Sequence, residues 1–160
     1  MLKLSKKADY GLIAVRHLSR HGVGEACSAA DISSACGISG TLMAKVLQKL
    51  AKAGLVISRH GSGGGYQLSR DPREISVFEV INAIDGPLTI TSCVTTRGEC
   101  EQALTCTVRE PLRRVNDSIL QILKTVTISQ MNEESSESGL VDLPGNKGEV
   151  HGRETADLHG

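Results

Sequence analysis

The chain has 160 residues, of which 39% are hydrophobic and 22% are charged, as in an ordinary globular protein. It contains neither an apolar run long enough to span a membrane nor a signal peptide, so we expect a cytoplasmic protein whose five cysteines form no structural disulfides. The formal net charge of zero is divided: residues 1–70 carry ten Lys and Arg against three Asp and Glu, and residues 71–160 carry eight against fifteen, which predicts that the first part binds a polyanion.

Three helices are predicted first, over about residues 5–21, 28–37 and 39–54, because a serine precedes each apolar pattern and a glycine follows it. The buried face of the first helix is expected to include Tyr10, Ile13, Ala14 and His17 or Leu18. The third helix has an apolar stripe at the spacing i, i+3, i+4, i+7, formed by Met43, Val46, Leu47 and Leu50. Two short helices joined by a tight turn are typical of a helix-turn-helix.

A β-hairpin is predicted next. Apolar runs at residues 55–58 and 66–69 flank a glycine-rich turn, and a hairpin directly after a helix-turn-helix would be a wing. Ser76 and Glu79 then form a capping box for a fourth helix, which ends at residues 85–87.

The last helix is predicted over about residues 107–130. Its apolar residues are separated by alternating steps of four and three, which indicates a heptad-like seam. The seam consists of Val108, Leu112, Val115, Ile119, Ile122 and Val126. Residues 132–160 contain seven acidic residues, two basic residues and five glycines, so we expect a disordered acidic tail.

The third helix is the predicted recognition helix. Its N-terminal turn, from Ser39 to Lys45, is the part that meets base edges when such a helix enters the major groove. Lysines on one helix face are often no more than a solvated surface, but the helix-turn-helix, the wing and the basic charge together favour DNA binding. The predicted DNA contacts are Ser39, Thr41 and Lys45 in the helix, and Arg59, His60 and Ser62 in the wing.

Cys93, Cys100 and Cys106 are separated by six and five residues in a turn-rich segment. Thiolates at this spacing can converge on one metal centre, either an iron–sulfur cluster or zinc. A structural zinc site needs four protein ligands in a compact unit, and no fourth Cys or His lies nearby. A labile iron–sulfur cluster is therefore the favoured interpretation, and no catalytic arrangement is found that would indicate an enzyme.

Two other thiols and two histidines are expected to have ordinary structural roles. Cys27 and Cys36 are expected to be buried small hydrophobic residues rather than ligands. His17 and His21 lie one turn apart and could share a metal ion, but an ordinary helix face is the commoner explanation.

The chain resembles the Rrf2 family of winged-helix regulators over about residues 1–131. The resemblance rests on the stretches Ile32…Gly37-Ile38-Ser39 and Gly63-Gly64-Gly65-Tyr66-Gln67-Leu68 and on the three cysteines. It implies a homodimer whose cluster state sets its affinity for DNA, with a dimerisation helix at 107–130. Ile84-Asp85-Gly86-Pro87-Leu88 is similar to the subgroup that regulates the SUF genes, which implies a repressor of iron–sulfur cluster assembly.

The resemblance leaves the fourth cluster ligand open. Some members have a histidine three residues after the last cysteine, where this chain has Arg109. Other members use an aspartate of the partner subunit at the position of Asp9, which is therefore the candidate here. A 2Fe–2S cluster is favoured, and a 4Fe–4S cluster is possible.

The predicted fold is mainly α with a small β-hairpin wing: a winged helix-turn-helix plus a long dimerisation helix. We expect a DNA-binding domain over residues 1–86, a cysteine-rich cluster-binding loop over 87–106, the dimerisation helix over 107–131 and the tail over 132–160. The expected partners are double-stranded DNA with a roughly palindromic operator and a second copy of the chain, with no membrane. Two alternatives remain: a nitric-oxide or redox sensor on the same scaffold, and a zinc-stabilised DNA-binding protein without sensing.

Overall fold

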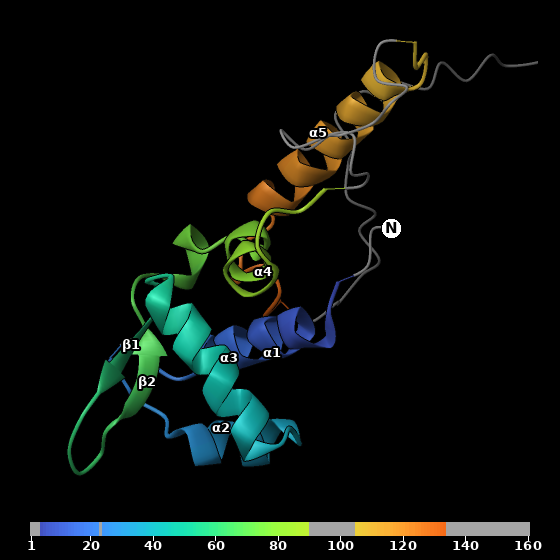
Figure 1. Ribbon diagram of the computed structural model, residues 1–160. Helices are drawn as coiled ribbons and strands as arrows, with labels where there is room; N and C mark the ends of the chain where they lie inside the picture. The colour runs from blue at the N-terminus through green and yellow to red at the C-terminus, as the bar shows by residue number, and fades with distance from the viewer. Residues whose placement is uncertain (1–3, 23, 90–104, 134–160) are drawn as a thin grey trace, which may run out of the picture.

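The computed structural model describes residues 4–22, 24–89 and 105–133. The elements follow one another in the order α1 (Lys6–Arg20), α2 (Ala29–Cys36), α3 (Gly40–Lys52), β1 (Val56–Arg59), β2 (Gly65–Leu68), the 3-10 helix η1 (Pro72–Glu74), α4 (Val77–Asp85) and α5 (Arg109–Thr125). β1 and β2 form a two-stranded antiparallel hairpin beside the first helices (Figure 1). The described residues therefore have the predicted mainly α fold with a small wing, and each strand lies within one residue of its expected position.

Serine side chains set the starts of four helices. In each case the Oγ atom accepts a hydrogen bond from the main-chain N–H three residues later, which satisfies a donor that has no partner within the helix. The four capping residues are Ser5, Ser28, Ser39 and Ser76. The predicted capping box at α4 is confirmed, because the Ser76 N–H also donates to Glu79 Oε2 at 2.8 Å.

The core lies where α1, α3 and α4 pack together, with α2 covering α3. The predicted stripe of α3 is confirmed, since each of its four residues is 2% exposed or less: Met43, Val46, Leu47 and Leu50. The predicted face of α1 is only partly right. Ala14 and Leu18 are buried, but Ile13 is 41% exposed. The helix instead turns Gly11 toward α4, where a Cβ atom on Gly11 would lie 3.0 Å from Ile84 Cγ1.

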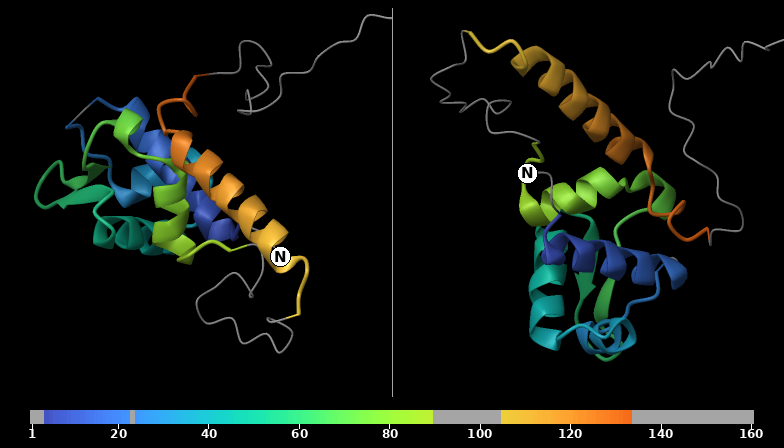
Figure 2. Two further views of the ribbon diagram at one scale, coloured as in Figure 1. Left: turned by 90° about the horizontal axis from the view of Figure 1, so that it is seen from above. Right: turned by 90° about the vertical axis from the view of Figure 1, so that its right-hand side faces the viewer.

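The helix α5 ends at Thr125, earlier than the expected Gln130. The reason is a return of the chain to the segment that begins α4: the Val77 N–H donates to the Val126 carbonyl and the Ile128 N–H to the Ile75 carbonyl, both at 2.9 Å. Ile128 is fully buried there. The C-terminal end of α5 is thereby anchored beside α4, while its N-terminal end extends away from the other helices (Figure 2).

Candidate nucleic-acid interface and metal-ligating residues

The turn between α2 and α3 determines how α3 is presented. Gly37 ends α2 with a φ of 64°, a conformation that glycine adopts without steric cost. The Ile38 N–H then donates to the Ser33 carbonyl at 3.0 Å, and Ser39 caps α3 directly afterwards. Since α3 buries its apolar stripe, its opposite face is exposed, and this face carries the predicted contacts Ser39, Thr41 and Lys45 together with Gln48 and Lys52.

Four lysines gather along the edge of this face. Lys45, Lys49 and Lys52 of α3 and Lys7 of α1 line a groove of about 320 Å³. Lys49 is partly engaged, because its Nζ donates to the Ile84 carbonyl at 2.6 Å. Ammonium groups on one surface attract phosphates, so the groove suits the backbone of a nucleic acid.

The wing carries the second group of predicted contacts. Arg59, His60 and Ser62 are all exposed there. The turn between the strands requires glycine: a Cβ atom on Gly64 would lie 2.4 Å from the Arg59 carbonyl oxygen. Figure 1 shows the wing loop at the same end of the molecule as α2, which is the end where α3 begins. The wing loop and the start of the predicted recognition helix therefore lie at the same end of the molecule.

Only two of the predicted cluster ligands lie among the described residues. Cys106 is a free, partly buried thiol shortly before α5. Asp9 is exposed in the first turn of α1. Cys93 and Cys100 lie outside the described residues, so their arrangement relative to Cys106 stays a prediction.

A cluster that the sequence interpretation identified only in part, as the pair His17 and His21, lies at the end of α1 and also includes Cys27. His17 and His21 have their Nε2 atoms 3.1 Å apart, and the ligand atoms of these two residues and Cys27 all lie within 4.8 Å of one another. Cys27 is buried as expected, at 9% exposure. The histidine spacing was a visible signal, but the position of Cys27 depends on the loop that returns from α1 to α2.

The environment of this cluster changes the protonation of its members. Burial lowers the pKa of His17, and the charges of His21 and Arg20 lower it further. Burial raises the pKa of the Cys27 thiol, with smaller contributions from Asp31 and Glu25. His17 is therefore biased toward the neutral imidazole, and Cys27 toward the protonated thiol.

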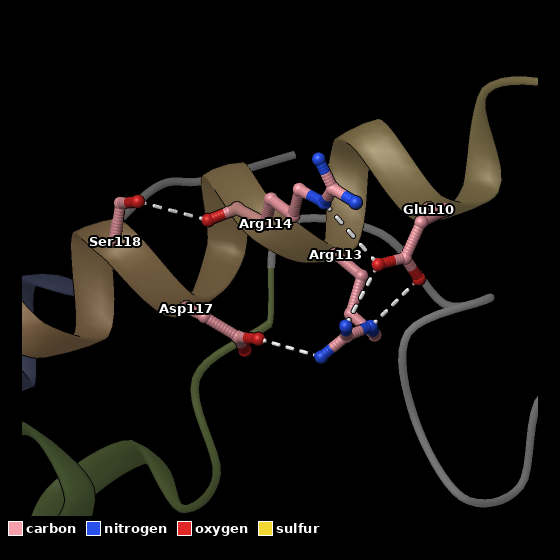
Figure 3. Close-up of polar contacts among 5 residues, drawn as sticks. All are labelled: Glu110, Arg113, Arg114, Asp117 and Ser118. Atoms are coloured by element: carbon pink, nitrogen blue, oxygen red, sulfur yellow. Dashed lines mark hydrogen bonds and ion pairs between the residues drawn. The ribbon is translucent and has the colours of Figure 1, made fainter.

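The helix α5 has one charged side and one apolar side. Arg113 donates to Glu110 at 2.8 Å and to Asp117 at 2.9 Å, and Arg114 donates to Glu110 at 3.3 Å (Figure 3). The hydrogen bonds from Arg113 lower the pKa of Glu110 to about 2. At 3.6 residues per turn, these groups lie opposite the predicted seam. In that seam Val108 and Val115 are 55% and 50% exposed.

Among the described residues, no helix has the length and apolar character needed to cross a membrane.

Known transcriptional regulators are similar to this chain in sequence and in fold. The sequence profile of the Rrf2 family, described as an iron-dependent transcriptional regulator, matches residues 4–134. The HTH-type transcriptional regulator IscR of Vibrio vulnificus strain YJ016 is 34% identical over 152 residues, which cover 92% of this chain and 90% of IscR. The solved structure of T. potens IscR matches with a TM-score of 0.66 and 29% identity, over 86% of this chain and 93% of that chain. CymR, the global cysteine regulator of B. subtilis, matches with a TM-score of 0.68 and 27% identity, over 82% of this chain and 97% of CymR.

Proposed function

Because this chain belongs to the Rrf2 family of iron-dependent transcriptional regulators, we propose that it holds an iron–sulfur cluster and represses genes of iron–sulfur cluster assembly, the SUF genes. As a member of this family it is a DNA-binding transcriptional regulator with a winged helix-turn-helix, and not an enzyme. The proposal extends to a cytoplasmic homodimer.

DNA recognition is supported by the exposed face of α3, whose N-terminal end lies at the same end of the molecule as the wing loop. Thr41 and Lys45 are exposed at the start of α3, where a recognition helix reads base edges. The lysine-lined groove beside them is suited to a phosphate backbone. Arg59, His60 and Ser62 would contact phosphate or the minor groove from the wing.

The proposed cluster ligands are Cys93, Cys100 and Cys106, with Asp9 of the partner subunit as the fourth. Three thiolates form the donor set that iron–sulfur clusters prefer. Cys106 fits this role as a free and partly exposed thiol, and Asp9 fits it because its exposed carboxylate is accessible to a second chain. A bound cluster would supply sensitivity to iron and to oxidants, and 2Fe–2S is the favoured type.

The seam of α5 supports a homodimer. Val108 and Val115 expose about half of their surface in one chain, while the charged groups occupy the opposite side. Two helices that join along such a seam place two recognition helices about a two-fold axis. The operator would then be roughly palindromic, with half-sites separated by one or more helical turns of DNA.

Anaerobic purification followed by visible spectroscopy and by iron and sulfide analysis tests the cluster. Alanine at Cys93, Cys100 or Cys106 should abolish the visible absorption, whereas Cys36→Ala should preserve it. A colourless protein with one zinc ion per chain would contradict the proposal and favour the zinc-stabilised alternative. Asp9→Ala should accelerate cluster loss and reduce the effect of the cluster on DNA affinity while the dimer persists. If Asp9→Ala matches the wild type in both, the fourth ligand lies elsewhere.

The sensing role is tested separately from the presence of the cluster. Two observations together would favour the alternative of a nitric-oxide or redox sensor. The cluster would respond only to nitric oxide or oxidants, and SUF transcription in the cell would not depend on this chain. Derepression of SUF transcripts on deletion of the gene is the expected result.

A further inference from the structure

The cluster of His17, His21 and Cys27 has the spacing of a metal site. In a tetrahedral zinc site with Zn–N distances of about 2.0–2.1 Å, two imidazole nitrogens lie roughly 3.3 Å apart. The Nε2 atoms of His17 and His21 are 3.1 Å apart. Cys27 places its sulfur within 4.8 Å of a ring nitrogen of each histidine, so small side-chain rotations bring three ligand atoms onto one ion.

We propose that His17, His21 and Cys27 form a second metal site, which binds a zinc-class divalent cation independently of the cysteines at positions 93, 100 and 106. Two imidazoles and one thiolate form a donor set for borderline and soft cations and do not suit Mg²⁺ or Ca²⁺. The neutral imidazole favoured at His17 is the form that binds metal. Cys27 binds as the thiolate, so its proton is released to solvent as the metal–sulfur bond forms.

A neighbouring cavity can complete the coordination. His21 and Gln67 both line a cavity of about 370 Å³. The Gln67 Oε1 atom is buried and has no hydrogen-bond partner among the described residues. The cavity beside His21 therefore offers room for a water molecule as the fourth ligand.

The site would connect α1 to the wing. The Cys27 N–H donates to the Tyr66 carbonyl at 2.9 Å, and the Tyr66 N–H donates to the Cys27 carbonyl at 2.8 Å. Arg59, at the other strand of the wing, lines the same cavity. A metal held by His17 and Cys27 would therefore fix the base of the wing to the end of α1 and reduce its local opening.

Cobalt titration of the full-length chain tests the site. The protein should carry alanine at positions 93, 100 and 106, so that the predicted cluster ligands cannot bind the probe. We expect one Co²⁺ per chain, with visible bands of tetrahedral cobalt, a thiolate-to-cobalt charge-transfer band in the near ultraviolet, and displacement of both by Zn²⁺. One proton per chain should be released, and Zn²⁺ should slow amide exchange at Cys27 and Tyr66.

Matched variants decide the result. Cys27→Ser should abolish the charge-transfer band. His21→Ala should lower the affinity for Co²⁺ by at least about tenfold, because even the loss of a residue that only hydrogen-bonds to a metal ligand lowers metal affinity by this factor or more. Cys36→Ser should leave cobalt binding unchanged. If Cys27→Ser does not fold, His21→Ala decides the test, because His21 is partly exposed.

Two results would overturn the proposal: no stoichiometric cobalt binding by the folded protein, or a cobalt affinity in His21→Ala equal to that of the parent protein. Because the tested protein lacks the three cluster cysteines, neither result bears on the iron–sulfur cluster proposed above.

Discussion

The main chains of Cys27 and Tyr66 are hydrogen-bonded to each other in both directions, at 2.9 and 2.8 Å. Residue 65 lies so close to this pair that a Cβ atom there would be 2.3 Å from the Cys27 carbonyl oxygen. Gly65 therefore permits the strand β2 to pack against the segment between α1 and α2. The orientation of the wing relative to the helix-turn-helix depends on this contact.

Gly65→Ala should loosen the wing. The added methyl group cannot be accommodated without moving main-chain atoms, so we expect a loss of about 0.5–3 kcal/mol in the free energy of unfolding, measured by urea denaturation. Amide exchange at Cys27 should also accelerate. Gly40→Ala is the control, because its Cβ would meet only Ser33 Oγ at 3.8 Å. Equal stability of Gly65→Ala and the wild type would show that the contact is unimportant.

Lys45→Ala should weaken binding to the operator. Lys45 is exposed on the recognition face, and loss of a base-edge contact costs about 1–3 kcal/mol. Binding to a labelled duplex at fixed salt measures the change. Lys124→Ala is the matched control, since Lys124 lies over the Phe78 ring near the end of α5. Unchanged affinity in Lys45→Ala would remove α3 from the interface.

Val115→Glu should convert the dimer to a monomer. Half of the Val115 side chain is exposed in one chain, and a carboxylate buried in a symmetric interface would face its own copy. Sedimentation at micromolar concentration measures the change in mass. Arg114→Ala, on the charged side of α5, should remain dimeric. A dimer in Val115→Glu would place the interface elsewhere.

The capping box at the start of α4 should stabilise the protein less in acid. Burial alone would raise the pKa of Glu79, but hydrogen bonds from Ser76 and Arg70 outweigh it, so the pKa lies below its ordinary value of 4.5. The contribution of Glu79 to the free energy of unfolding is therefore fully present above pH 4.5, and it is lost as the pH drops through the lowered pKa of the folded state. Urea denaturation of Glu79→Gln should show a weaker pH dependence in this range than that of the wild type. Identical pH profiles for Glu79→Gln and the wild type would contradict the assignment.

Local patterns predicted most of the fold. The serine caps and the stripe from Met43 to Leu50 depend on neighbouring residues, so the starts of the helices and the packing of α3 followed from the sequence. The exposure of Ile13 did not, because α1 packs on α4 through Gly11, which has no side chain to signal a buried face.

Long-range contacts account for the other differences. Val126 continues the apolar spacing of α5, but its carbonyl accepts from Val77, so the helix ends before it. The short distance between Cys27 and His17 likewise depends on the loop between α1 and α2, and the sequence pattern gives no information on the path of a loop. The predicted DNA contacts in α3 and the wing are exposed, as the local pattern indicates, but their contact with DNA and the convergence of Cys93, Cys100 and Cys106 stay predictions.

We propose above that an iron–sulfur cluster sets the affinity of this regulator for DNA. The most direct test of this proposal is a pair of binding curves from one anaerobic preparation, before and after removal of the cluster, on a duplex selected from random sequence at one salt concentration. We expect dissociation constants that differ by about 5- to 150-fold, the usual range of coupling between two sites. Equal dissociation constants for the two forms would contradict it.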